Sequence, residues 1–378
     1  MRGRIEPNPS FIAVVDLEAR VRSNHPLRRI KEVCDKALRE LDSELDRLYK
    51  EGGRPSIPPE QLLKGSLLQI IYGIRSERQL CERIDDSLTF RWFLDLPLDQ
   101  EAWVPTVYTH NRDRLLTTEI SRNFLTRVVE QARTRGMVSS DHFSVDGTLL
   151  QAWASNKSLQ PMEADSDDDV PPPGSPPSSS EVAPAPKGKD VLRNFRGERF
   201  SNQTHRSSSD PDSRLARKGD NVAAKPSYLG NALIENRSGL VVEGEVRLAS
   251  GDGGEVAAAL AMIDRMEGDH AITVGADKAY DCHDFVDCCR EMNTSAHAAQ
   301  NRTHHRRSFV PDEVARTDGY KVSIQRRKRI EQVFGWIKLS AGIRQLKVRG
   351  KEAVSGLFLL ALAAFNLVRM SRLMAAPA

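Results

Sequence analysis

The chain has 378 residues, of which 39% are hydrophobic and 28% are charged, and its net charge is only +3. This length is enough to bury a sizeable core and favours two domains. The composition is that of an ordinary soluble protein, and the small net charge alone indicates nothing about nucleic acid.

The cysteines, the N-terminus and the most apolar stretch argue against export and membrane insertion. The five cysteines are odd in number and follow no regular framework, which suits a reducing cytoplasm. Residues 282–289 lack the paired CxxC spacing of a zinc cluster, so structural thiols are favoured. The N-terminus has no apolar run of the secretory type. The stretch 356–368 is shorter than the ~20 residues of a membrane span and contains Asn366, so we expect a buried helix.

Residues 25–115 have the periodicity of helices. The stretch 58–73 begins with proline in its first turn and places its leucines and isoleucines on one face. Ser76 and Gln79 form a capping-box signature for a second helix. The two helices resemble a helix-turn-helix, although most such helical hairpins simply pack on each other. The basic residues that this motif would offer to phosphates are Arg75, Arg78 and Arg83.

Beyond residue 120 the pattern changes to strands that alternate with helices. The Pro/Ser/Asp-rich stretch 166–190 cannot bury enough apolar surface to fold, and it is predicted to be a flexible insertion. Strands followed by strand–helix alternation and a closing helix predict a mixed sheet covered by helices. The expected elements are strands at about 143–149, 271–277 and 295–300, a hairpin at 228–248, helices at about 253–266 and 283–292, a long helix around Glu331, and the C-terminal helix.

Three carboxylates stand where an acid is hard to explain structurally. Asp146 and Asp277 lie at or near the ends of apolar strand-like runs, and strand alternation places each opposite the aliphatic face. Gly147 and Gly275 beside them would leave space for a ligand backbone. Together with Glu331, these acids would form a site for hard divalent cations that act on phosphodiesters.

Glu331 lies in the most basic part of the chain. Residues 301–350 contain 13 Lys and Arg against 4 Asp and Glu, which is the electrostatic footprint of phosphate binding. On a helix, Arg327, Glu331 and Lys338 fall within about 40° of one another beside the apolar face. The structural alternative is that each acid only caps a turn or makes helix-surface contacts. Taken singly that alternative is favoured, but the combination with the basic block favours catalysis.

The spacing around Glu331 resembles the signature of bacterial DDE transposases of the insertion-sequence-five type. That signature is Tyr, two residues, Arg, three residues, Glu, six residues, Lys. Arg327, Glu331 and Lys338 stand at these spacings, whereas Ile324 occupies the Tyr position. Tyr320 lies one helical turn earlier.

Other segments resemble the same family and extend the resemblance over most of the chain. VDGT (145–148) and GADKAY (275–280) are similar to its first and second acidic segments. Segments similar to its N-terminal domain and to the stretch before its hairpin are 53–63, 72–80, 90–96, 201–219 and 227–242.

The resemblance implies an α/β fold: a ribonuclease-H-like mixed sheet flanked by helices and preceded by an all-α N-terminal domain. Its first and fourth strands would carry Asp146 and Asp277, and a later helix would carry Glu331. The implied division is a helical DNA-binding-like domain at 1–120 and a catalytic domain at 121–375, with a disordered insertion at 160–200.

The resemblance also implies the activity, a transposase that cuts and rejoins DNA at terminal inverted repeats. Asp146, Asp277 and Glu331 would be both catalytic and metal-binding, with two Mg²⁺ ions or Mn²⁺ as a substitute. The polar segment 201–219, with Asp210 and Asp212, would approach DNA or the active site. The implied DNA-binding residues are Arg327, Lys338, Arg326, Lys328, Arg75, Arg78, His205 and Arg206.

The implied partners are double-stranded DNA, as element ends and target, and a second copy of the chain in a synaptic homodimer. The protein would act on chromosomal or plasmid DNA in the bacterial cytoplasm, without membrane contact. Three alternatives stay open: a non-catalytic DNA-binding regulator, a related ribonuclease-H-like nuclease, and an inactive relic.

Overall fold

The computed structural model of the protein describes residues 14–49, 52, 56–162, 200–219, 222–250, 254–266, 268, 270–302 and 307–375. The predicted insertion at 160–200 lies almost wholly outside these residues, as does most of the basic segment 304–307.

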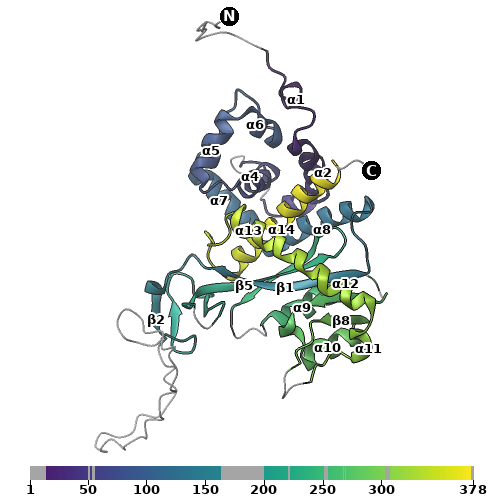
Figure 1. Ribbon diagram of the computed structural model, residues 1–378. Helices are drawn as coiled ribbons and strands as arrows, with labels where there is room; N and C mark the ends of the chain where they lie inside the picture. The colour runs from purple at the N-terminus through teal and green to yellow at the C-terminus, as the bar shows by residue number, and fades with distance from the viewer. Residues whose placement is uncertain are drawn as a thin grey trace, which may run out of the picture.

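The first part of the chain is helical, as expected. Ser76 Oγ accepts the Gln79 N–H at 3.2 Å, so the predicted cap is confirmed. Figure 1 shows this helical part of the chain above the sheet. The helices are α1 (Leu17–Arg20), α2 (Pro26–Glu40), α3 (Asp42–Asp46), α4 (Pro59–Ile71), α5 (Glu77–Asp86), α6 (Leu88–Leu94), α7 (Pro105–Leu115) and α8 (Thr118–Thr134).

In the α4–α5 hairpin, α4 is packed into the molecule and α5 has an exposed face. Residues 62–68 of α4 are all buried, whereas Arg78 on α5 is exposed. Gly73 in the turn has φ +60°, and a Cβ there would lie 2.6 Å from the Ser340 carbonyl oxygen. The turn is therefore pressed against a distant part of the chain, and only α5 keeps an open face.

The centre of the molecule is a mixed sheet built around β1 (His142–Gln151). On one side β1 pairs antiparallel with β5 (Lys225–Glu235), which pairs in turn with β6 (Val241–Leu248) and with the short β4 (Arg214–Ala216). On the other side β7 (Ile272–Ala276) and β8 (Thr294–Ala298) run parallel to β1. Across the long strands the order is β6-β5-β1-β7-β8, so three antiparallel strands are followed by two that run parallel to the first. This is the ribonuclease-H-like arrangement, and the predicted fold class is confirmed.

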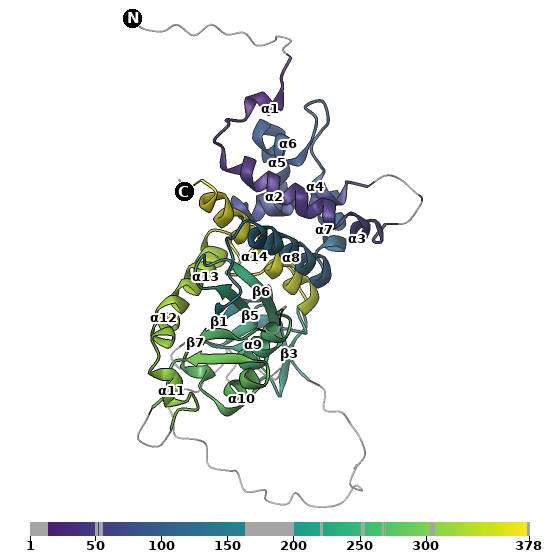
Figure 2. The same cartoon turned by 90° about the vertical axis from the view of Figure 1, so that its right-hand side faces the viewer.

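Helices cover both faces of the sheet (Figure 1). α9 (Gly254–Asp264) and α10 (His283–Glu291) lie below it, and α8 and α14 (Lys351–Leu373) lie above it. The expected long helix around Glu331 is divided into α12 (Asp318–Arg326), the 3₁₀ turn η3 (Arg327–Arg329) and α13 (Ile330–Leu339), which follow one another along one side of the sheet (Figure 2). The remaining short elements are η1 (Asn156–Ser158), β2 (Leu159–Pro161), β3 (His205–Ser207), η2 (Lys278–Tyr280) and α11 (Asp312–Ala315).

The C-terminal helix α14 joins the two parts of the chain. By length and composition alone it is apolar enough to cross a membrane, but 72% of its most apolar window is buried inside the protein. It packs on α8 and β6 of the lower part and on α2 and α4 of the upper part. The expectation of a buried helix is therefore confirmed.

Asn366 is the one polar side chain whose place in this helix looked anomalous, and it holds the edge of the sheet. Its Oδ1 accepts the Val241 N–H at 2.9 Å and its Nδ2 donates to the Val241 carbonyl at 2.7 Å. Both residues are buried, so neither backbone group has water as an alternative partner.

Replacing Asn366 with leucine should destabilise the protein by about 2–4 kcal/mol, because two buried backbone groups lose their partners. The measurement is urea denaturation followed by circular dichroism. Ser371→Ala on the same helix removes only one long hydrogen bond, to Pro26 at 3.3 Å, and should cost less than about 1 kcal/mol. Equal losses in the two variants would contradict this role of Asn366.

Candidate active site

The predicted acids lie where two parallel strands separate. β1 and β7 pair in register only as far as Ser144 opposite Gly275, whereas β1 and β5 stay paired as far as Gln151. Asp146 lies two residues after Ser144 on β1, and Asp277 lies two residues after Gly275, just past the end of β7. The chain thus opens a split at the carboxyl ends of adjacent parallel strands, the usual place for a binding crevice in α/β sheets.

Asp146, Asp277, Glu331 and Arg327 share one electrostatic environment. Burial raises the pKa of the Asp146 carboxyl, and the charges of Asp277 and Glu331 raise it further. A hydrogen bond from the Gly147 N–H at 2.8 Å and the charge of Arg327 oppose this rise in pKa. The fold therefore brings the three acids and one predicted cation within electrostatic reach of one another.

Each aspartate also has a local structural role, as the alternative interpretation proposed. Asp146 Oδ1 accepts the N–H of Gly147, and Asp277 Oδ1 accepts the N–H of Ala279 at 2.8 Å and caps η2. In the described part of the chain, the second oxygen of each aspartate has no hydrogen-bond donor. Glu331 is exposed on α13 and makes no ion pair with the described cations, so the predicted alternative of helix-surface pairing is not observed.

The expectation that Gly275 leaves space for a ligand backbone is wrong. A Cβ on Gly275 would lie 2.9 Å from Ser144 Oγ, 3.3 Å from the Ser323 carbonyl oxygen and 3.6 Å from Arg327 Cβ. The glycine instead allows the end of α12 to approach the sheet closely. That approach sets the position of Arg327 and, one turn later, of Glu331.

Gly147 has a similar role on the other face, where it makes room for a carboxylate that the sequence analysis did not single out. A Cβ there would lie 2.7 Å from both Asn231 Oδ1 and Glu255 Oε1. Burial and the charges of Asp146 and Asp277 raise the pKa of Glu255 to about 7. In the sequence, Glu255 falls in the first turn of the helix expected at about 253–266, and its place soon after the hairpin is the available signal.

The chemistry of the donor set fits a hard divalent cation, although the side chains do not enclose one as they stand. Among the described residues, no three His, Cys, Asp or Glu side chains form a ready metal-binding group. The donors that converge are carboxylate oxygens, which Mg²⁺ and Mn²⁺ prefer. A cation between Asp146 and Asp277 would also relieve the like-charge repulsion that raises the pKa of Asp146.

Basic side chains flank the acids on the same face of β1. Lys338 Nζ donates to Thr148 Oγ1 at 2.5 Å, and strand alternation places Thr148 on the face that carries Asp146. Burial lowers the pKa of Lys338, and the charges of Lys218 and Arg344 lower it further. Such crowding of cations favours an anionic ligand.

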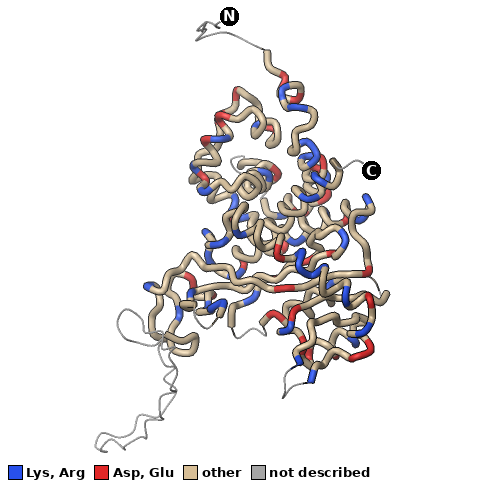
Figure 3. The backbone as a smooth tube through the Cα atoms, viewed as in Figure 1, with Lys and Arg blue, Asp and Glu red and all other residues tan. Residues whose placement is uncertain are grey.

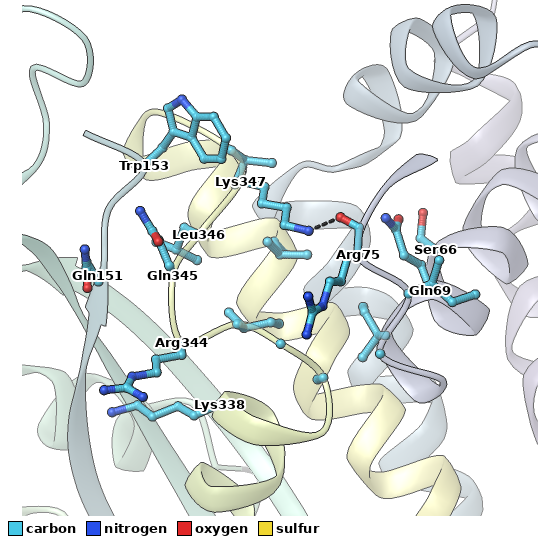
Figure 4. Close-up of a pocket in the computed structure, with 18 of the residues that line it drawn as sticks. Ser66, Gln69, Arg75, Gln151, Trp153, Lys338, Arg344, Gln345, Leu346 and Lys347 are labelled. Carbon is cyan, nitrogen blue, oxygen red and sulfur yellow. Dashed lines mark hydrogen bonds between the residues drawn. The ribbon is translucent and has the colours of Figure 1, made fainter. Parts of the chain in front are cut away.

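A cavity of about 690 Å³ continues from Lys338 to the helical part of the chain. Figure 4 shows Lys338 and Arg344 side by side on one wall and Arg75 on the other. The Arg75 carbonyl accepts a hydrogen bond from Lys347, and Trp153, which is 46% exposed, lies at the rim. The structure thus brings two predicted DNA-binding residues, Arg75 and Lys338, to one cavity.

The other predicted DNA-binding residues lie apart from this cavity. In the view of Figure 3, basic and acidic residues are interspersed along the described part of the chain. Arg326 and Lys328 are exposed on either side of Arg327, and Arg78 is exposed on α5. His205 and Arg206 lie on β3, which pairs only with β2 in a small separate sheet.

Asp210 and Asp212 have structural roles at the start of α14 that the sequence analysis did not predict. Asp210 is buried and accepts hydrogen bonds from the Tyr228 hydroxyl at 2.5 Å and the Gly350 N–H at 3.1 Å. Asp212 accepts the Lys351 N–H at 2.9 Å. Both carboxylates therefore fix this segment to the start of α14.

Tyr320, one helical turn before Ile324, is held at the end of β8. Its hydroxyl donates to the Ala298 carbonyl at 2.9 Å and accepts the Gln300 N–H at 3.2 Å. These contacts anchor α12 to the end of β8.

Two family comparisons match most of the chain. Residues 15–114 match the family described as "Transposase domain (DUF772)", and residues 202–367 match the family described as "Transposase DDE domain". The second range contains Asp277, Glu331 and Glu255, and Asp146 lies between the two ranges. These matches do not distinguish the insertion-sequence-five type from other branches.

Two transposases are among the solved structures found by comparison, each with low similarity to this chain. The piggyBac transposase in a synaptic complex with hairpin DNA is 9% identical, over 93% of this chain and 76% of that chain, with a TM-score of 0.41. A Mos1 mariner paired-end complex with Mn is 13% identical over 90% of this chain and 85% of that chain, with a TM-score of 0.20. No curated protein has a significantly similar sequence. The fold assignment rests on the strand order given above.

Proposed function

Because the chain belongs to the DDE transposases, we propose that it binds the terminal inverted repeats of an insertion sequence and catalyses metal-dependent cleavage and transfer of DNA strands. Asp146, Asp277 and Glu331 are the proposed catalytic residues. The observation that supports the proposal is that the charges of Asp277, Glu331 and Arg327 all reach Asp146 at the split between β1 and β7, while Lys338 binds Thr148 two residues further along β1.

The residues at the split suit phosphodiester chemistry. Two divalent ions, Mg²⁺ or Mn²⁺, would supply activation of the attacking oxygen and stabilisation of the leaving 3′ oxygen. The free oxygens of Asp146 and Asp277 are the proposed ligands, and Glu331 on α13, whose charge reaches Asp146, is the third. Arg327, whose charge reaches Asp146, is placed to balance the negative charge that gathers on the scissile phosphate.

The cavity beside Lys338 gives the DNA strand a path from the split to the helical part of the chain. Lys338 and Arg344 would hold backbone phosphates two residues along β1 from Asp146, and Arg75 would contact the strand from α4–α5. Exposed Arg78 would extend this contact on α5. Arg326 and Lys328 are assigned to DNA outside the split, and His205 and Arg206 to more distant DNA contacts.

The assembly and location follow from the proposed activity. Two element ends must be held together, so we infer a homodimer in the synaptic complex. We infer further that the protein acts on double-stranded chromosomal or plasmid DNA in the bacterial cytoplasm. The division into a DNA-binding-like domain at 1–120 and a catalytic domain at 121–375 is part of the same proposal.

A purified-protein assay on a supercoiled plasmid that carries the inverted repeats tests the chemistry. Mg²⁺-dependent nicking should fall by roughly 100-fold or more in Asp146→Asn, Asp277→Asn and Glu331→Gln, because each removes a proposed metal ligand. Asp264→Asn changes an exposed acid on α9 and should leave nicking intact.

The same assay separates the alternatives. Unchanged nicking in all three acid variants would contradict the assignment of the site. DNA binding without any nicking by the unaltered protein would favour a regulator or an inactive relic. Nicking without strand-transfer products would favour a related nuclease.

Lys338→Gln and Arg344→Gln should each weaken binding to the element ends roughly tenfold at ~0.1 M salt, because each removes a phosphate contact. Each should also reduce the slope of log affinity against log salt by about 0.9. The measurement is fluorescence anisotropy over a salt series. Arg290→Gln serves as the control, because Arg290 is an exposed residue of α10 on the other face of the sheet. If the Lys338 and Arg344 variants gave the same slope as this control, the proposal that DNA binds in the cavity would be contradicted.

A further inference from the structure

We infer that Glu255 is a fourth acidic residue of the catalytic site and binds the divalent cation together with Asp146 and Asp277. This inference rests on the proposed function, since it assigns a further ligand to the same cation. It would bring acids from three separate segments to the split between β1 and β7: β1 itself, the end of β7, and the first turn of α9.

The position of Glu255 is fixed by the backbone of the strand that carries Asp146. If Gly147, the residue that follows Asp146, carried a Cβ atom, that atom would lie 2.7 Å from Glu255 Oε1. Any side chain at Gly147 would displace this carboxylate. Because Gly147 pairs with Asn231 across β1 and β5, the Asn231 side chain meets Glu255 at the same point.

Two buried polar atoms beside these carboxylates have no hydrogen-bond partner in the described part of the chain. One is the hydroxyl of Tyr280, a fully buried residue, and the other is Asn231 Oδ1, also fully buried. The charges of Glu255, Asp146 and Asp277 all reach the Tyr280 hydroxyl. A buried O–H that the charges of three carboxylates reach, but that is bonded to none of them, favours a polar occupant near it, such as a cation and its bound water.

Glu255, which is half-buried, differs from Glu235 and Glu243, the glutamates that are buried in the described part of the chain. Glu235 accepts hydrogen bonds from Ser139 and Ser238, and Glu243 is paired with Arg122 and Arg265. Glu255 has no such ion pair or hydrogen bond among the described residues. Its only charged neighbours there, Asp146 and Asp277, repel it. An acid placed in this way suits a bound cation better than a role in packing.

The test is titration of the full-length protein with Mn²⁺, without DNA, by calorimetry. Glu255→Gln keeps the shape of the side chain and should weaken Mn²⁺ binding roughly 10- to 100-fold, an effect of the size seen for residues that support a metal site. Glu255→Asp keeps the charge and should recover part of the affinity. Glu60→Gln is the matched control, because Glu60 is also half-buried in the first turn of a helix, α4, and it should bind as the unaltered protein does.

Thermal melting without metal gives a second measurement that a purely structural role would not satisfy. Because Glu255→Gln removes a repelling carboxylate, its melting temperature without metal should equal or exceed that of the unaltered protein. Addition of Mn²⁺ should raise the melting temperature of Glu255→Gln less than it raises that of the unaltered protein. A lowered melting temperature together with Mn²⁺ affinity within twofold of the unaltered protein would overturn the inference.

Asp146→Asn in the same titration distinguishes the two levels of the proposal. If Asp146→Asn loses Mn²⁺ binding and Glu255→Gln does not, the site at the split stands and the fourth ligand is rejected. If neither variant changes Mn²⁺ binding, the proposed cation site itself fails, and Glu255 fails with it.

Discussion

Mutual repulsion of carboxylates at the split between β1 and β7 is the constraint on which the site depends. Asp146 and Asp277 are held on diverging strands, and burial raises the pKa of Asp146, as do the charges of Asp277 and Glu331. A fold gains no stability from such an arrangement unless a cation joins it. The close approaches at Gly147 and Gly275 maintain the crowding from both faces of the sheet. Strain of this electrostatic kind is typical of functional sites.

The same region is where the two parts of the chain meet. The turn at Gly73 presses against Ser340, just after α13, and α14 packs on helices of both parts. Arg75, Lys338 and Arg344 consequently line one cavity although they come from distant segments. A DNA strand bound there would contact the helical part and the catalytic part together, so that recognition of an element end is coupled in space to the acids that cut it.

Much of the architecture followed from local pattern, because periodicity and capping act over a few residues. The α5 cap at Ser76, the buried face of α13 and the buried C-terminal helix were predicted correctly, and the order of strands agreed with the resemblance. Local pattern did not predict the tertiary contacts. These include the atoms that occupy the space beside Gly147 and Gly275, and the hydrogen bond by which Asp210 anchors α14. Glu255 was missed for the same reason, since a helix-starting acid becomes part of a site only when the sheet brings β1 beneath it.

Anomalous diffraction at the manganese edge, from crystals of the full chain grown with Mn²⁺ and a DNA 3′ end, would test the central claim most directly. A manganese peak shared by the carboxylates of Asp146 and Asp277 is the predicted result. Manganese bound elsewhere, with those two side chains still capping their own turns and sharing no ion, would contradict the account.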